Sequence, residues 1–191
     1  MKKVFIKLLA VVLVAAFAKT AYQAQAVSSS TEIAQASSPL ANAAIAVTLP
    51  TTVNLVLKNE SSMTGQLTAF DSKGQTLQIS RSGNSRTVQI AQIQRLNFRQ
   101  DALVYDGTGK LVIRGDDTAV AKQSTWQNIP LQAFELKDPK LGQAQVTLAG
   151  VLKPTQLRGI RAVAAKSLYV VNEIQFQPAG KMTIEVMPTD R

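Results

Sequence analysis

Two side chains that carry much of enzyme and metal chemistry are missing: the 191 residues include no histidine and no cysteine. Without histidine there is no Ser-His-Asp triad and no side chain whose unperturbed pKa lies near neutrality. Without cysteine there is no thiol nucleophile and no disulfide, so the core alone must hold the fold. Zinc and iron sites built on these two ligand types are therefore excluded.

The remaining routes to catalysis have little support in the sequence. The one adjacent acidic pair is Asp116-Asp117, in a polar stretch at 116–125, and a hydrolase would have to combine it with Glu135 or Glu173. No calcium loop of the DxDxDG type is present, and "DGTGK" lacks the spacing of a phosphate-binding loop. We therefore expect a protein that is not an enzyme, with no catalytic, cofactor-binding or metal-binding residue.

The N-terminus is typical of a secretory signal peptide. The basic "MKKVFIK" is followed by an apolar run, "LLAVVLVAAFA", and by the small-x-small sequence Ala24-Gln25-Ala26. The apolar run is well short of the roughly 20 residues of a membrane-spanning helix, although an uncleaved anchor is the alternative. We predict a signal peptide at 1–26 with cleavage after Ala26, or else after Ala18 or Ala36. The mature chain is then periplasmic or extracellular and lacks a transmembrane span.

The basic charge is modest once this segment is removed. The formal net charge of +9 includes four lysines of the signal peptide, so the mature chain carries about +5. This charge suits weak attraction to anionic envelope polymers or lipid surfaces, or simple solubility. It is not typical of a dedicated nucleic-acid binder, and we expect no nucleic-acid partner.

The mature chain reads as mostly β. Residues 27–46 are rich in Ser and Ala with the single charge Glu32, and indicate a flexible linker, with a short helix as the alternative. From residue 47, short runs of alternating apolar residues are separated by turn sequences such as "DSKG" (71–74) and "SGN" (82–84). We predict a small β-barrel followed by a hairpin at 47–115, with a 3₁₀ turn at 91–93.

A second antiparallel β module is predicted at 116–191. Leu168, Val170, Ile174 and Phe176 alternate on one face, and "PAGK" (178–181) predicts a hairpin turn to the last strand. The segment 153–166 fits either one helical turn or an irregular loop. The sequence leaves open whether the two modules are independent domains, and it leaves the oligomeric state open.

The stretch "LVLKNESSMTGQLTAFD" (55–71) resembles the first sequence motif of the Sm-like family of small β-barrels, which are related in shape to SH3 domains. The match lies in "LKN" (57–59), Gly65, Leu67, Phe70 and Asp71. The resemblance implies a barrel whose long second strand bends at Gly65, with Leu67 in the core and Asp71 capping a turn.

Other positions of the chain depart from the Sm pattern. Glu60 stands where the family has glycine, Gln75 stands where RNA-binding members have a base-contacting asparagine, and "SKG" lacks an aromatic residue for base stacking. The resemblance thus implies the fold without the RNA pocket.

Candidate binding residues are four arginines and the lone tryptophan: Arg81, Arg86, Arg95, Arg99 and Trp126. The arginines alternate with glutamines and form either a binding face or an ordinary solvated face. Trp126 is either a core residue or a platform for a sugar ring. We predict a non-enzymatic interaction or structural protein of the cell envelope, whose barrel loops, sheet edge or Arg/Gln face contacts a protein or anionic polymer. The alternatives are a carbohydrate-binding module using Trp126, a hydrolase and an Sm-type RNA binder.

Overall fold

The computed structural model describes residues 44–112 and 123–190. The predicted signal peptide, its cleavage position after Ala26 and nearly all of the predicted linker lie outside these residues, as do Asp116 and Asp117. No helix in the described part of the chain is long and apolar enough to cross a membrane.

The prediction of a mostly β protein is confirmed: the described residues form eleven strands, one α-helix and three short 3₁₀ turns. In chain order these are β1 (Ile45–Thr48), β2 (Val53–Leu57), β3 (Ser62–Asp71), β4 (Thr76–Arg81), β5 (Asn84–Gln89), η1 (Ile90–Gln92), β6 (Ile93–Phe98), β7 (Ser124–Pro130), η2 (Leu131–Ala133), β8 (Phe134–Asp138), β9 (Gln143–Val146), α1 (Pro154–Ala164), β10 (Ser167–Gln177), η3 (Pro178–Gly180) and β11 (Lys181–Asp190).

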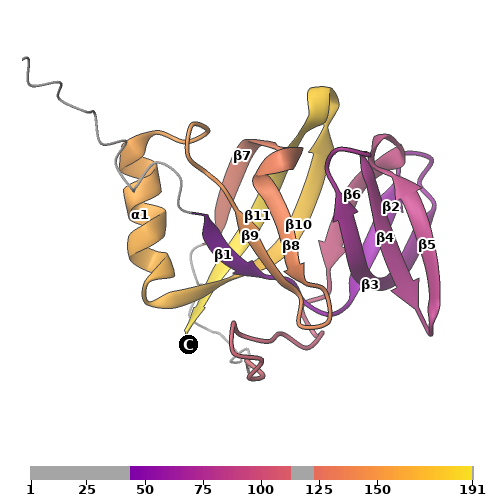
Figure 1. Ribbon diagram of the computed structural model, residues 1–191, viewed down its shortest axis with the longest axis horizontal. Coiled ribbons are helices and arrows are strands. Elements are labelled where there is room, and N and C mark those ends of the chain that lie inside the picture. The colour runs from indigo at the N-terminus through magenta and orange to yellow at the C-terminus, as the bar shows by residue number, and fades with distance from the viewer. Residues whose placement is uncertain (1–43, 113–122, 191) are drawn as a thin grey trace, which may run out of the picture. The chain divides into compact units, whose positions relative to one another are not determined.

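All eleven strands belong to one hydrogen-bonded sheet (Figure 1). Nine of them follow the order β5-β4-β3-β2-β6-β10-β1-β9-β8, while β11 pairs with β10 and β7 pairs with β11. We call strands β2 to β6 the barrel half, and the remaining strands with α1 the C-terminal half. The two halves join where β6 pairs with β10, at Glu173 opposite Asn97 and Gln175 opposite Arg95.

The barrel half must curl, because a three-residue turn connects its two outermost strands. β5 and β6 stand at opposite ends of the order β5-β4-β3-β2-β6, which would separate them by about 19 Å in a flat sheet. The link from Gln89 to Ile93 spans at most about 14 Å. The turn η1 also confirms the 3₁₀ turn expected in this region, and its first residue, Ile90, is buried.

A short 3₁₀ turn also connects the two outermost strands of the C-terminal half. The 3₁₀ turn η2 connects β7 to β8, which lie at opposite ends of the order β7-β11-β10-β1-β9-β8. A flat sheet would place these strands about 24 Å apart, well beyond the reach of the turn. Leu131 at the start of η2 is buried, as Ile90 is in η1. Both halves are thus curled around a shared apolar interior.

Gly65 marks the bend of the long strand β3. Residues before it pair with β2, from Ser62 to Gly65, and residues after it pair with β4, from Gln66 onward. A Cβ atom at Gly65 would lie 2.5 Å from both Ile79 Cγ2 and the Ser80 carbonyl oxygen, so only glycine fits this close approach. At the other end of β3, Asp71 Oδ1 accepts hydrogen bonds from the amides of Lys73 and Gly74, both at 2.9 Å, and so caps the turn.

A single apolar core runs through both halves. Three phenylalanines from three strands meet where the halves join. Phe70 of β3 packs edge-on against Phe134 of β8, with ring centroids 5.0 Å apart, and lies parallel to Phe176 of β10 at 6.5 Å. These contacts hold the curled edge of β8 against β3.

Irregularities in two strands shift the alternation that the sequence suggested. The β3–β4 register slips between Leu67 and Ala69, so Phe70 rather than Ala69 follows Leu67 on the inner face, and Ala69 is exposed. Strict alternation from Leu67 would bury Ala69 as well, and the register shift is the reason that Ala69 is exposed instead.

A second bulge, at Asn172, separates two sets of buried residues on β10. Before it, Leu168 and Val170 pack with Val104 and Val112 in a small cluster apart from the main core. After it, Ile174 and Phe176 face the main core. The prediction that these four residues of β10 share one face is wrong, because the bulge reverses the alternation.

The segment predicted as a helical turn or loop contains the 11-residue helix α1. Pro154 occupies its first position, where a missing amide proton costs nothing, and the Gln156 side chain accepts a hydrogen bond from the Lys153 amide at 3.2 Å. Leu157, Ile160 and Ala164 face the core at helical spacing. The expectation of a single turn is thus too short.

Three further segments can be compared with the sequence prediction. β1 begins at Ile45, so the last two residues of the predicted linker belong to a strand, which pairs parallel with β10 and antiparallel with β9. The predicted hairpin after the barrel is present as a bridge between Tyr105 and Leu111. The predicted turn at 178–181 is confirmed by η3, where Ala179 has a φ of +60°.

Candidate functional site

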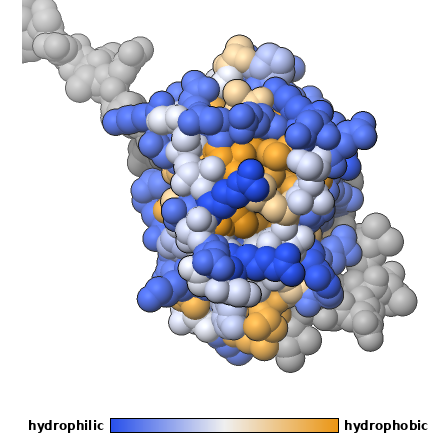
Figure 2. Space-filling view, turned by 90° about the vertical axis from the view of Figure 1, so that its right-hand side faces the viewer, coloured by the Kyte–Doolittle hydropathy of each residue, from blue (hydrophilic) through white to orange (hydrophobic). Residues whose placement is uncertain are grey.

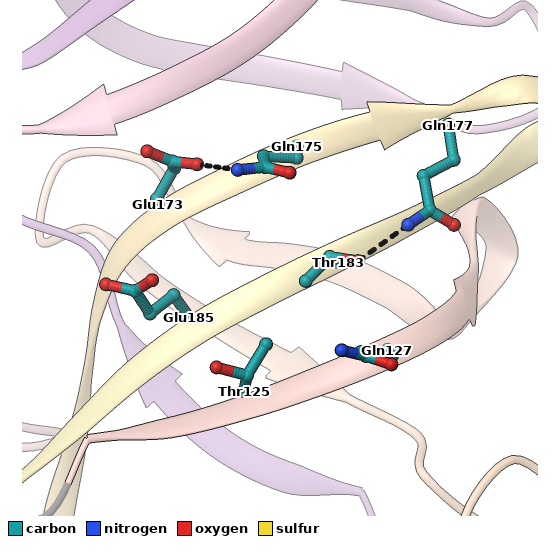
Figure 3. A pocket seen from close by; sticks show the side chains of 7 residues that line it. All are labelled: Thr125, Gln127, Glu173, Gln175, Gln177, Thr183 and Glu185. Atoms are coloured by element: carbon teal, nitrogen blue, oxygen red, sulfur yellow. Dashed lines mark hydrogen bonds between the residues drawn. The ribbon is translucent and has the colours of Figure 1, made fainter.

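A polar groove of about 330 Å³ lies on the outer face of β7, β11 and β10 (Figure 3). Its seven lining side chains are amides, hydroxyls and carboxylates: Thr125, Gln127, Glu173, Gln175, Gln177, Thr183 and Glu185. They project from the same face because each strand contributes alternate residues, while Trp126, Ile174 and Ile184 between them point into the core. We call this set the polar groove.

The carboxylates of Glu173 and Glu185 occupy directly opposite positions on β10 and β11. Like charges placed opposite each other in an antiparallel pair are unfavourable. Burial raises the pKa of Glu185, and the neighbouring charge of Glu173 raises it further. The opposed carboxylates of Glu173 and Glu185 therefore lower the stability of the folded protein.

Glu173 is held in place by neighbours on two strands. With its amide turned so that both bonds form, Asn97 donates to Glu173 Oε2 at 2.9 Å and accepts from Arg95 Nε at 3.2 Å. The Gln175 amide donates to Glu173 Oε1. A row of polar groups thus runs from the groove across β10 to Arg95 and Asn97 on β6.

Other groove side chains retain hydrogen-bonding capacity for a ligand. Gln177 Nε2 donates to Thr183 Oγ1 at 2.8 Å (Figure 3). Within residues 44–112 and 123–190, no side chain or backbone group pairs with the side chains of Thr125, Gln127 or Glu185. Amide, hydroxyl and carboxylate groups together offer donors and acceptors along one face.

The four predicted arginines do not form one cluster. Arg95 lies beside the polar groove, opposite Gln175. Arg99, past the end of β6, forms an ion pair with Asp101, and the hydrogen bond to that carboxylate, followed by its charge, raises the pKa of the guanidinium. Arg81 ends β4 opposite Asn84, and Arg86 of β5 lines a different pocket with Lys58. Only Arg95 thus adjoins the groove.

Trp126 is a core residue in this structure, with 2% of its surface exposed. Its ring meets the ring of Tyr169 edge-on, with centroids 5.2 Å apart. The indole Nε1 is buried and has no hydrogen-bond partner among the described residues. The ring presents no surface on which a sugar can stack.

Of the carboxylates considered for hydrolysis, the structure describes Glu135 and Glu173, which lie on different strands and have different partners. Asp116 and Asp117 lie outside the described residues. Glu135, on β8, forms an ion pair with Lys137, and the hydrogen bond from Lys137 is the main cause of its lowered pKa. Glu173 lies on β10 and is paired instead with Asn97 and Gln175. Across the described ranges, no group of three or more acidic side chains is arranged to hold a metal ion.

The polar groove was not predicted from the sequence, although the sequence holds a signal for it. Glu173, Gln175 and Gln177 alternate with buried residues on β10, as do Thr183 and Glu185 on β11. Such alternation is also typical of an ordinary solvated strand face, so pairing across three strands is needed to recognise a groove.

Comparisons with known proteins give no lead to the site. No protein-family model, no curated protein and no solved structure matches this chain.

Proposed function

We propose that the protein is an exported, non-enzymatic binding protein of the cell envelope, and that its polar groove binds a hydroxyl-rich polymer, that is, a polysaccharide. The observation that carries this proposal is the row of amide, hydroxyl and carboxylate side chains on three adjacent strands. Sugar hydroxyls donate and accept hydrogen bonds, and this mixed lining matches both roles.

The charge of the groove selects among polymers. Glu173 and Glu185 lie in it, whereas Arg95 only adjoins it. A ligand rich in carboxylate or phosphate would meet two like charges, so the groove favours a neutral or amino-bearing saccharide. This proposal departs from the anionic polymer or protein partner expected from the Arg/Gln pattern. It agrees with the alternative of a carbohydrate-binding module that the sequence offered, but Trp126 is not the residue on which the sugar stacks.

The fold assignment and export belong to the same proposal. We propose that the barrel half is an Sm-like or SH3-like barrel, supported by the strand order, the bend at Gly65 and the turn η1. The signal sequence supports a periplasmic or extracellular location, where polysaccharides are abundant. Binding of RNA is not expected, since Gln75 replaces the base-contacting asparagine of RNA-binding Sm-like proteins and the 72–74 turn has no aromatic residue on which a base could stack.

Isothermal titration with neutral and amino-bearing polysaccharides tests the proposal. The variant Gln127→Ala/Gln175→Ala removes two amides from the groove, and we expect it to weaken binding by about tenfold or more. The matched control, Gln89→Ala/Gln132→Ala, removes two exposed amides outside the groove and should bind as the wild type does. Equal affinity of the two double variants, or no binding of any polysaccharide by the wild type, would overturn the proposal.

A further inference from the structure

A second pocket lies beside η1, the turn that connects the two end strands of the barrel half. It has a volume of about 370 Å³ and is lined by Leu57, Lys58, Asn59, Arg86 and Gln92. These residues come from the end of β2, the following turn, β5 and η1. We call it the barrel-end pocket.

The barrel-end pocket carries two cations without a carboxylate of its own. Lys58 and Arg86 are exposed, and neither makes an ion pair with any other described residue. The nearest carboxylate along the chain is Glu60, which is exposed and does not line the pocket. Two unpaired cations around one hollow leave its potential positive.

The backbone of the pocket is fixed by local hydrogen bonds. The Lys58 amide donates to the Gln92 carbonyl at 2.9 Å, which ties the end of β2 to η1. Asn59 Oδ1 accepts from the amide and the hydroxyl of Ser61, at 3.2 and 2.7 Å. No described group accepts a hydrogen bond from Asn59 Nδ2 or from the side-chain amide of Gln92, so both can donate to a ligand next to the two cations.

The fifth lining residue is apolar. Leu57 is partly buried and packs against the main core. Leu57 gives the pocket one apolar contact beside its four donor side chains. On the side of the molecule that carries β4 and β5, Figure 2 shows an apolar area framed by hydrophilic residues, so other apolar side chains also reach the surface of the barrel half.

We infer that the barrel-end pocket binds a phosphate group attached to a short carbon chain. Arg86 and Lys58 neutralise the charge, and the amides of Asn59 and Gln92 donate to the remaining oxygens. Leu57 contacts the adjoining carbons. This site is separate from the polar groove, whose carboxylates would repel the same ligand, so it goes beyond the proposed function.

Titration in phosphate-free buffer tests the inference. The protein is purified in the form that cells produce and is titrated with inorganic phosphate and, separately, with glycerol phosphate. We expect glycerol phosphate to bind more tightly than inorganic phosphate because only it contacts Leu57. Lys58→Gln/Arg86→Gln should weaken both by at least tenfold, whereas Lys73→Gln/Arg81→Gln, with the same loss of charge outside the pocket, should leave both unchanged. Weakening should also follow from added salt.

Vesicles that contain phosphatidylglycerol, compared with phosphatidylcholine vesicles, identify the source of the phosphate. Retention on phosphatidylglycerol that depends on Lys58 and Arg86 supports a lipid headgroup, and binding of glycerol phosphate without vesicle retention supports a soluble or polymeric phosphate.

Thermal unfolding confirms that each variant is folded, and Lys58→Arg/Arg86→Lys should keep most of the affinity. No binding of either phosphate, or equal binding by the two charge-removing variants, would overturn the inference.

Discussion

Glu173 and Glu185 lie directly opposite each other on the antiparallel strands β10 and β11. Asn97 and Gln175 hydrogen-bond Glu173, whereas Glu185 has no such partner among the described residues. A like-charged pair in this position opposes folding. Under the proposed function, the unfavourable Glu173–Glu185 pair is present because both carboxylates accept hydrogen bonds from the bound polysaccharide.

Glu185→Gln should therefore stabilise the protein at neutral pH by about 0.2–1 kcal/mol, because it removes the repulsion. The pKa of Glu185 is raised by folding, so the folded state binds this proton more tightly than the unfolded chain does. The contribution of Glu185 to stability consequently falls as pH rises through the range above its usual value of 4.5. Urea unfolding at neutral pH and at about pH 4 measures the difference, which should shrink at the lower pH.

The control is Glu60→Gln, which removes a carboxylate from an exposed turn outside the groove. A stabilisation by Glu185→Gln that is independent of pH, or one matched by Glu60→Gln, would contradict the electrostatic explanation.

Gly65→Ala should destabilise the barrel half strongly, because its Cβ would meet the Ser80 carbonyl oxygen and Ile79 at 2.5 Å. Overpacking of this kind costs about 1–3 kcal/mol. One of the two atoms that the Cβ would meet, the Ser80 oxygen, belongs to the backbone. Gly159→Ala is the matched control, since nothing lies within 4 Å of its added Cβ. In the middle of α1 it should stabilise by about 0.5–1 kcal/mol. Chemical denaturation distinguishes the two, and similar midpoints would contradict the close-packing argument.

Trp126 should prove structural rather than ligand-binding. Trp126→Ala removes a buried ring that contacts Tyr169, and should cost about 3–5 kcal/mol. Trp126→Phe keeps an aromatic ring and removes the unpartnered Nε1, so it should be milder. The folded Trp126→Phe variant should bind polysaccharide with the affinity of the wild type. A large loss of affinity without a loss of stability would restore Trp126 as a binding residue.

The barrel half should not assemble into rings through its end strands. Pairing with β10 occupies the edge of β6 within the same chain, from Arg95 to Asn97, so that edge has no room for β5 of a second copy. Light scattering after size exclusion should give no ring-sized species. Rings that disappear when β5 is altered would show that the β6–β10 pairing can be displaced.

The sequence predicted local features better than long-range ones. The bend at Gly65 and the cap at Asp71 were implied by the resemblance to Sm-like barrels, and each depends on one residue and its neighbours. The bulges beside Leu67 and at Asn172 were not, since an extra residue in a strand leaves the apolar pattern nearly unchanged while reversing which face is buried.

The candidate site was harder to predict than the strands. Glutamines and glutamates at alternate positions describe any solvated strand, and only the pairing of β7, β11 and β10 collects Gln127, Gln175 and Glu185 on one face. The β7–β11 pairing joins residues 51 positions apart at Pro130 and Lys181 and 62 positions apart at Ser124 and Val186, and periodicity carries no information about it. For the same reason, the sequence did not predict that the four arginines lie apart: they are close in sequence but lie at different places on the curled sheet.

The most direct test of the polysaccharide proposal is a map of amide chemical shifts during titration with a neutral polysaccharide that the protein binds. The account predicts that the shifts concentrate at residues 125–127, 173–177 and 183–185, with smaller changes at Arg95 and Asn97 on the adjoining strand. Shifts confined to other surfaces, with these three segments unchanged, would contradict it.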